Sequence, residues 1–146
     1  MKTKNDPRHQ SRIIALQKLF EQEFKSNSPF PIAELQLLNE DRVEPLQIDE
    51  TFALSLVKGV MDNETEIDNI IRKYTMKRPF EDTSKIDLLV LRIAIFELLY
   101  ASKKLPEKVI IDEAVELGKE FGGNKSFTFI NGILGNISHD YVHEKS

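Results

Sequence analysis

The side chains that most often carry catalysis or bind metals are sparse in this 146-residue chain, and their spacing suits neither task. The sequence has no cysteine, which excludes thiol nucleophiles, redox chemistry and zinc–thiolate sites. His139 and His143 stand one helical turn apart, but the supporting carboxylate of a zincin motif is missing. Asp112 and Glu113 are adjacent, so on a helix they point in different directions. We therefore predict no catalytic residue, no metal site and no cofactor, and expect the protein not to be an enzyme.

Charged residues are distributed in blocks. Residues 1–25 carry six basic and three acidic side chains, residues 26–70 carry two and ten, and residues 71–85 carry five and two. Two basic blocks therefore flank an acidic one, so a positive patch and a negative face could coexist on one surface. Ordinary charge scatter is the alternative interpretation.

Residues 86–101 form the stretch around which the rest of the chain is organised. Thirteen of these sixteen residues are apolar, and the exceptions, Asp87, Arg92 and Glu97, leave no continuous polar stripe on a helix. A helix that is apolar all round is either the centre of a bundle or a membrane span, and three charges argue against the membrane. Ser84, three residues before Asp87, marks the start of this helix as a capping box does. We predict the buried axis of an all-helical domain.

Helical periodicity continues on both sides of this axis, and the sequence predicts about seven helices and no strand. Pro7 and Pro106 are predicted to open helices, and Asp49, Asn63 and Ser126 to cap helix starts. A short helix is expected near residues 32–38, and a left-handed C-cap at Gly122-Gly123. The polar N-terminus lacks the apolar core of a signal peptide, and no transmembrane run exists. We expect a soluble cytoplasmic protein without membrane partners.

Residues 105–134 carry a longer motif, LPEKVIIDEAVELGKEFGGNKSFTFINGIL. It closely resembles the C-terminal part of the NusB transcription antitermination family, whose pattern runs as proline, a V-I-N-E-A-V-E-L-A-K helix, Phe-Gly, then F-V-N-G-V-L. Residues 91–98 resemble the family's L-R-I-A-x-x-E-L helix, and residues 12–20 resemble its A-R … Q-x-L-Y motif. The resemblance covers nearly the whole chain.

The resemblance implies an all-α fold with two packed helical subdomains around residues 86–101, forming one RNA- and protein-binding domain over residues 1–146. It implies a transcription antitermination factor that binds boxA-type single-stranded RNA together with ribosomal protein NusE, in complexes that keep RNA polymerase transcribing rRNA genes. Other Nus factors and the polymerase would be indirect partners. Some members self-associate, so a homodimer stays open.

Candidate RNA-binding residues follow from the chemistry of single-stranded RNA, which is held by cations on phosphates and by aromatic rings or amides on bases. Arg8 and Arg12, with Lys2, Lys4 and His9 nearby, supply cations. Carried over by position, the resemblance adds Gln17, Phe20, Tyr74, Phe121, Gly122, Ser126 and Phe129. Each has a structural alternative: a solvated helix face for the arginines, the core for the phenylalanines, and a helix cap for Gly122.

The chain departs from the family pattern in places that bear on RNA binding. The arginine-rich N-terminal run thins to Arg8 and Arg12, and Phe20 stands where a tyrosine is common. Gly118 replaces an alanine, which weakens that helix by up to ~1 kcal/mol. Lys125 stands where members can carry an acid. Our hypothesis is that Lys125 adds a phosphate contact that partly offsets the thinner N-terminus.

NusE is expected along the helices of residues 67–81 and the exposed edge of the central helix. Asp87 and Glu81 are the candidate contacts, because a basic ribosomal protein would meet acids there. The alternative for Asp87 is a helix-start residue favoured by the macrodipole. Arg92, within the apolar helix, is predicted to have a structural ion-pair or hydrogen-bonding role instead of contacting RNA, because burying it unpaired is costly.

Two other functions stay open. One is a helical protein-binding module, for NusE or another Nus factor, whose RNA binding is weak or lost. The other is an accessory domain, because NusB-like modules also occur fused to RNA cytosine methyltransferases. The free-standing factor is favoured, since the sequence has no dinucleotide-type glycine fingerprint and no second domain.

Overall fold

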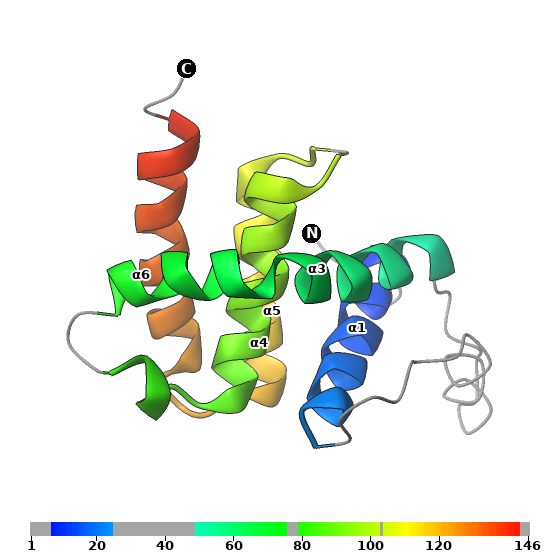
Figure 1. Ribbon diagram of the computed structural model, residues 1–146, viewed down its shortest axis with the longest axis horizontal. Coiled ribbons are helices and arrows are strands. Elements are labelled where there is room, and N and C mark those ends of the chain that lie inside the picture. The colour runs from blue at the N-terminus through cyan, green and yellow to red at the C-terminus, as the bar shows by residue number, and fades with distance from the viewer. Residues whose placement is uncertain (1–6, 25–48, 76–78, 103, 144–146) are drawn as a thin grey trace. The chain divides into compact units, whose positions relative to one another are not determined.

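The computed structural model describes residues 7–24, 49–75, 79–102 and 104–143, without the side chains of Phe24 and His143. Within these residues the chain forms five α-helices and no strand (Figure 1). The α-helices are α1 (Pro7–Phe24), α3 (Glu50–Tyr74), α4 (Lys85–Ile95), α5 (Glu107–Phe121) and α6 (Ser126–Ile137). The 3-10 turn η1 (Phe80–Asp82) precedes α4, and the π-helical segments η2 (Phe96–Tyr100) and η3 (Ser138–His143) continue α4 and α6. The all-α prediction is confirmed, and the short helix expected near residues 32–38 lies outside the described residues.

Helix α3 is continuous where the sequence predicted two helices. Its start is as expected, because the backbone N–H of Phe52 donates to Asp49 Oδ1 at 3.0 Å. Asn63, predicted to cap a second helix, instead donates from Nδ2 to the Gly59 carbonyl, 2.8 Å away and one turn earlier. An asparagine can thus satisfy its amide within a continuing helix. This merger accounts for part of the difference between about seven expected helices and the five observed.

The chain divides into two compact units, Met1–Lys58 and Gly59–Ser146. In the first unit, the Oγ of Ser11 on α1 accepts a hydrogen bond from the Asp49 backbone N–H at 2.9 Å, just before α3 begins. Among the described residues of this unit, the buried apolar ones are Ile14, Ala15, Leu16, Leu19, Ala53, Leu56 and Val57. The hydrogen bond between Ser11 and Asp49 and these apolar residues therefore help to set the register of α1 against the start of α3.

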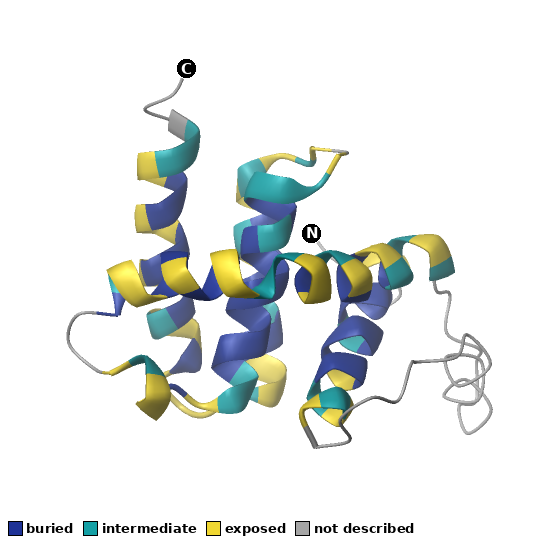
Figure 2. Cartoon of the chain, in the orientation of Figure 1, coloured by how far each residue is buried: buried dark blue, intermediate teal, exposed yellow. Residues whose placement is uncertain are grey.

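Helix α4 is the buried axis of the second unit, as the sequence predicted. Every residue from Asp87 to Ile95 is buried, and Figure 2 shows the helix dark blue along most of its length. It packs against α5 and α6, which also pack against each other. Ser84 caps it, with Oγ accepting from the Asp87 N–H at 3.2 Å. No helix among the described residues is long and apolar enough to cross a membrane.

Arg92 makes the structural ion pair that was predicted for it. Its Nε and Nη2 donate to Asp68 Oδ1 and Oδ2 at 2.8 and 2.9 Å, a bidentate arrangement between α4 and α3. Glu64 Oε1 lies 3.8 Å from Nη1. Two parallel charge-assisted hydrogen bonds fix both partners in the core.

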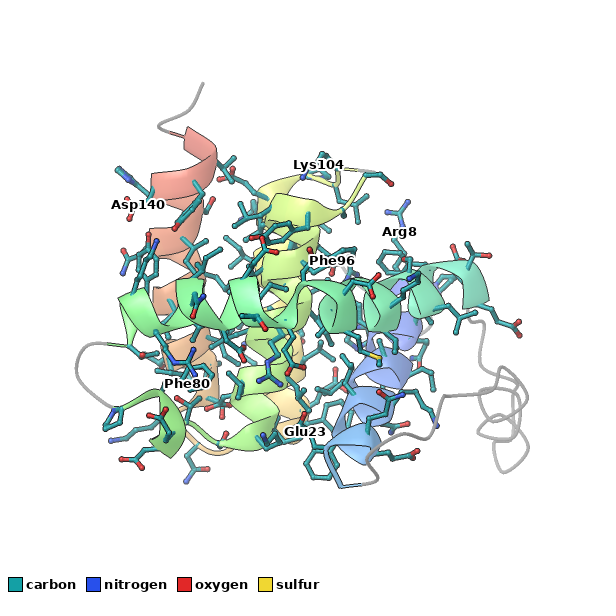
Figure 3. All side chains as sticks on the ribbon, viewed as in Figure 1. Arg8, Glu23, Phe80, Phe96, Lys104 and Asp140 are labelled. Carbon is teal, nitrogen blue, oxygen red and sulfur yellow. The ribbon has the colours of Figure 1, made fainter. Side chains whose placement is uncertain are left out.

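Two glycines allow side chains of neighbouring helices to approach closely. A Cβ at Gly59 would lie 2.1 Å from the Phe96 ring, which packs against α3 (Figure 3). A Cβ at Gly118 would lie 2.7 Å from the terminal Cδ1 of Ile130. Gly59 therefore meets an aromatic ring, whereas Gly118 meets the flexible end of an aliphatic chain.

Candidate nucleic-acid interface

Four predicted RNA-binding residues lie on α1 in the first unit. Arg8 and Gln17 are exposed and Phe20 is half-buried. Arg12 is only 2% exposed, and its guanidinium lies 5.1 Å from the centre of the Phe52 ring. A ligand could thus reach Arg8 and Gln17 directly, whereas Arg12 is buried and makes a cation–π contact with Phe52.

The cations expected around Arg8 and Arg12 do not gather on one exposed face in the described residues. His9, which the sequence placed with them, is buried. Lys2 and Lys4 lie outside the described residues. Helix α1 buries several polar residues in addition to its apolar ones. The apolar pattern of the sequence therefore did not predict that His9 is buried.

The turn between α5 and α6 differs from its prediction in two details. Neither Gly122 nor Gly123 has a left-handed conformation, and Gly122 has φ −94° and ψ −168°. A Cβ at Gly122 would meet Ser126 Oγ at 2.3 Å and the Gly118 carbonyl at 2.8 Å, so glycine is required for space. Ser126 does not cap α6, which begins at this residue; its Oγ accepts from the Gly123 N–H at 2.8 Å and closes the turn.

A pocket of about 600 Å³ lies beside this turn, between the start of α4 and the start of α6. Its lining residues are Ser84, Asp87, Gly123, Lys125, Ser126, Thr128 and Phe129. It brings together three predicted RNA-binding residues and one predicted partner contact. Lys125 is exposed and Phe129 half-buried, whereas Ser126 and Asp87 are buried. The pocket therefore carries one cation, one carboxylate and an aromatic ring.

Tyr74 lies elsewhere in the second unit, at the end of α3. Its hydroxyl donates to Asp140 Oδ2 at 2.7 Å, and the neighbouring Lys73 Nζ lies 3.4 Å from the Tyr141 hydroxyl. Figure 3 labels Asp140 on η3. These exposed contacts attach η3 to α3, so Tyr74 has a structural role in addition to any contact with a ligand.

The remaining candidates are at the surface of the second unit. Phe121 is 38% exposed at the end of α5, and Glu81 is exposed in η1. Next to Glu81, the ring of the half-buried Phe80 has its centre 4.2 Å from the guanidinium of the exposed Arg72, a stack that the sequence did not predict. The two residues are eight positions apart, and α3 ends between them, so no helical spacing predicted this pair.

No group of three or more histidine, cysteine or acidic side chains could hold a metal ion within the described residues. His139 Nδ1 lies 3.4 Å from Asp140 Oδ1, and the side chain of His143 is outside the description. Burial and nearby acidic or phenolic groups raise the pKa of Tyr100 above its ordinary value of 10.0, with burial the larger cause.

The described residues form an all-α fold with a charged pocket beside the first turn of its central helix. The NusB family model matches residues 9–139, and the chain belongs to the NusB family. Members of this family are transcription antitermination factors and not enzymes.

Individual relatives agree with this assignment. The transcription antitermination protein NusB of Chloroflexus aggregans is 38% identical over 140 residues, covering 94% of this chain and 91% of the relative. That of Ligilactobacillus salivarius is 40% identical over 131 residues, covering 89% and 96%. The structure of T. maritima NusB superposes with a TM-score of 0.76 at 31% identity, covering 99% of this chain and 97% of that one. A chain in a structure titled as a plectonemic RNA supercoil, 21% identical with a TM-score of 0.76, shares the fold.

Proposed function

We propose that this protein is an antitermination factor that binds boxA-type single-stranded RNA together with ribosomal protein NusE and supports transcription of rRNA genes in the cytoplasm. Membership of the NusB family supports the general role. The observation that carries the RNA-binding part is the pocket beside the α5–α6 turn, where Lys125 and Phe129 stand together. A cation and an aromatic ring are the two side-chain types that hold a phosphate and a splayed base.

The proposed RNA-binding set keeps the residues predicted from the sequence but divides their tasks. Arg8 and Lys125, both exposed, contact phosphates. Gly122 and Ser126 shape the turn that presents Lys125. Arg12, packed over Phe52, supports α1 instead of reaching a phosphate in this conformation. The other members of the proposed set are Gln17, Phe20, Tyr74, Phe121 and Phe129.

A helical protein-binding module with weak RNA binding is the second candidate function. It is favoured by the burial of Arg12, which leaves Arg8 as the exposed arginine of the predicted pair. In both functions Glu81, exposed in η1, is the proposed contact for a basic ribosomal protein. Asp87 is buried, so a partner could reach its carboxylate only through the pocket. Other Nus factors and RNA polymerase would be reached indirectly, and a homodimer stays open.

The test is the binding of a fluorescent boxA-type RNA across a salt series, with and without NusE. We expect NusE to tighten binding, and log affinity to fall with log salt by about 0.7 per phosphate neutralised. Lys125→Glu should weaken RNA binding about fivefold, the effect of roughly 1 kcal/mol, and reduce the salt slope. Lys108→Glu is the matched control, because the Lys108 side chain is 87% exposed on α5 and does not line the pocket.

Each result separates the two candidate functions. RNA binding that NusE tightens and that Lys125→Glu weakens supports the antitermination factor with its pocket contact. NusE binding without RNA binding would favour the protein-binding module. An unchanged affinity and salt slope in Lys125→Glu would remove Lys125 from the RNA-binding set.

A further inference from the structure

The carboxylate of Asp87 is buried and incompletely satisfied. The residue is 5% exposed and stands in the first turn of α4, where its backbone N–H donates to Ser84 Oγ. Its Oδ1 atom has no hydrogen-bond partner among the residues that the structure describes. A buried acceptor without a donor carries a desolvation penalty, so such atoms are rare in folded proteins and call for an explanation. A donor brought by a ligand would supply one.

The position of Asp87 shows where such a ligand could bind. Asp87 lines the pocket of about 600 Å³ beside the α5–α6 turn, a volume within the range of small-molecule sites. Lys125, exposed and immediately before α6, lines the same pocket. Phe129 contributes an apolar surface, and Ser84 and Thr128 contribute hydroxyls. A ligand here meets a buried carboxylate and an exposed ammonium group within one cavity.

The two charges restrict the ligand. An arginine or lysine side chain from a protein would satisfy Asp87 but would be repelled by Lys125. A nucleotide satisfies both, because its phosphate is anionic and its base carries N–H donors. Among the four RNA bases, guanine presents N1–H and the 2-amino group side by side, which match the two oxygens of a carboxylate. Adenine and cytosine place an acceptor beside their amino group, and uracil flanks its single N–H with two carbonyls.

We propose that this pocket takes a guanine base of single-stranded RNA, with its Watson–Crick edge on the Asp87 carboxylate and an adjacent phosphate on Lys125. The inference rests on the proposed function and adds base selectivity to it. Asp87 then determines which base enters the pocket, and Lys125 contributes to affinity for any sequence. This division follows the general distinction between base contacts, which specify, and phosphate contacts, which position.

The experiment measures binding of a boxA-type RNA in which each guanosine is replaced in turn by inosine, which lacks only the 2-amino group. We expect one replacement to weaken binding to the wild-type protein about tenfold, within the range for a lost bidentate base contact. Asp87→Asn, whose amide cannot accept both donors, should bind the guanosine and inosine RNAs within about twofold of each other. Asp82→Asn, an exposed acid in η1 that does not line the pocket, is the matched control and should keep the tenfold preference.

The outcomes distinguish failure of this inference from failure of the proposed function. If the wild-type protein binds the RNA but tolerates every inosine, or if Asp87→Asn keeps the preference, RNA binding stands and base reading by Asp87 is overturned. If Asp87→Asn weakens NusE binding and leaves the guanosine preference unchanged, the pocket receives a protein side chain instead. If no boxA-type RNA binds, with or without NusE, the RNA-binding function falls and this inference with it. The inosine series on the wild-type protein gives an answer even if Asp87→Asn does not fold.

Discussion

Asp68 and Asp87 are both buried carboxylates of the second unit, but their surroundings differ. Asp68, in the C-terminal part of α3, accepts two hydrogen bonds from the Arg92 guanidinium. Asp87, at the start of α4, lines a pocket, and its buried Oδ1 has no hydrogen-bond partner in the described part of the chain. Arg92 and Asp87 are on the same helix, five residues apart. The last turn of α4 therefore carries a bidentate ion pair to α3, and its first turn carries a buried carboxylate oxygen that lacks a donor among the described residues.

This difference in hydrogen bonding distinguishes a carboxylate that stabilises the fold from one that could bind a ligand. A buried ion pair with matched geometry recovers much of its desolvation penalty from its own partner. A buried carboxylate oxygen that lacks a donor gains the missing hydrogen bond when a ligand brings one. Both aspartates are buried to a similar degree, and their hydrogen bonds distinguish them.

The largest expected effect on stability comes from breaking the ion pair between Asp68 and Arg92. Asp68→Asn removes the charge that compensates Arg92 and should lower the free energy of unfolding by about 3 kcal/mol, because a buried guanidinium is left poorly paired. Urea denaturation with an unchanged m-value would measure it. Asp62→Asn, an exposed acid on the same helix, should change stability by less than about 0.5 kcal/mol. A loss in Asp68→Asn no larger than in Asp62→Asn would mean that the pair contributes little.

The second comparison concerns space in the core instead of charge. Gly59→Ala would push a methyl group into the Phe96 ring and should cost about 1–3 kcal/mol. Gly118→Ala meets only Ile130 Cδ1, and the better helix propensity of alanine, worth up to about 1 kcal/mol, should offset the shift. Thermal or urea unfolding of the two variants tests this order. Equal losses would show that the Ile130 side chain cannot move aside.

Sequence reasoning was reliable where one local cause decides the outcome. The all-round apolar pattern of residues 86–101 identified the buried axis, and Ser84 and Asp49 identified two helix starts. The ion pair of Arg92 followed from the cost of burying a lone charge, although its partner Asp68, 24 residues away, could not be named.

Sequence reasoning was less reliable where local signals compete or the cause is tertiary. Asn63 has the composition of a cap but lies inside α3, because its amide bonds to the preceding turn. Gly122 suggested a left-handed cap, yet it is glycine for the space that Ser126 occupies. Lys125 and Asp87, named for different ligands, line one pocket only because α4 and α6 pack together. That juxtaposition has no signature in the sequence.

The smallest expected effect on stability comes from a substitution in the first turn of α4. Asp87→Asn makes the same chemical change as Asp68→Asn but should alter the free energy of unfolding by less than about 1 kcal/mol. The variant loses a favourable interaction between the carboxylate and the N-terminus of α4, about 0.3–1 kcal/mol, and gains from removing a buried charge that is incompletely hydrogen-bonded. Urea denaturation of the two Asn variants side by side gives the difference directly.

The order of the two variants is thus expected to reverse between two measurements, the free energy of unfolding and the preference for guanosine. Asp68→Asn should dominate in unfolding and, where the protein remains folded, leave the guanosine preference intact, whereas Asp87→Asn should be nearly silent in unfolding and lose that preference. If Asp87→Asn destabilised the protein as much as Asp68→Asn, its carboxylate would be a structural group, and the unpartnered Oδ1 would no longer argue for a ligand. A small effect on unfolding combined with lost base selectivity has no structural explanation, because a change in packing would appear in both.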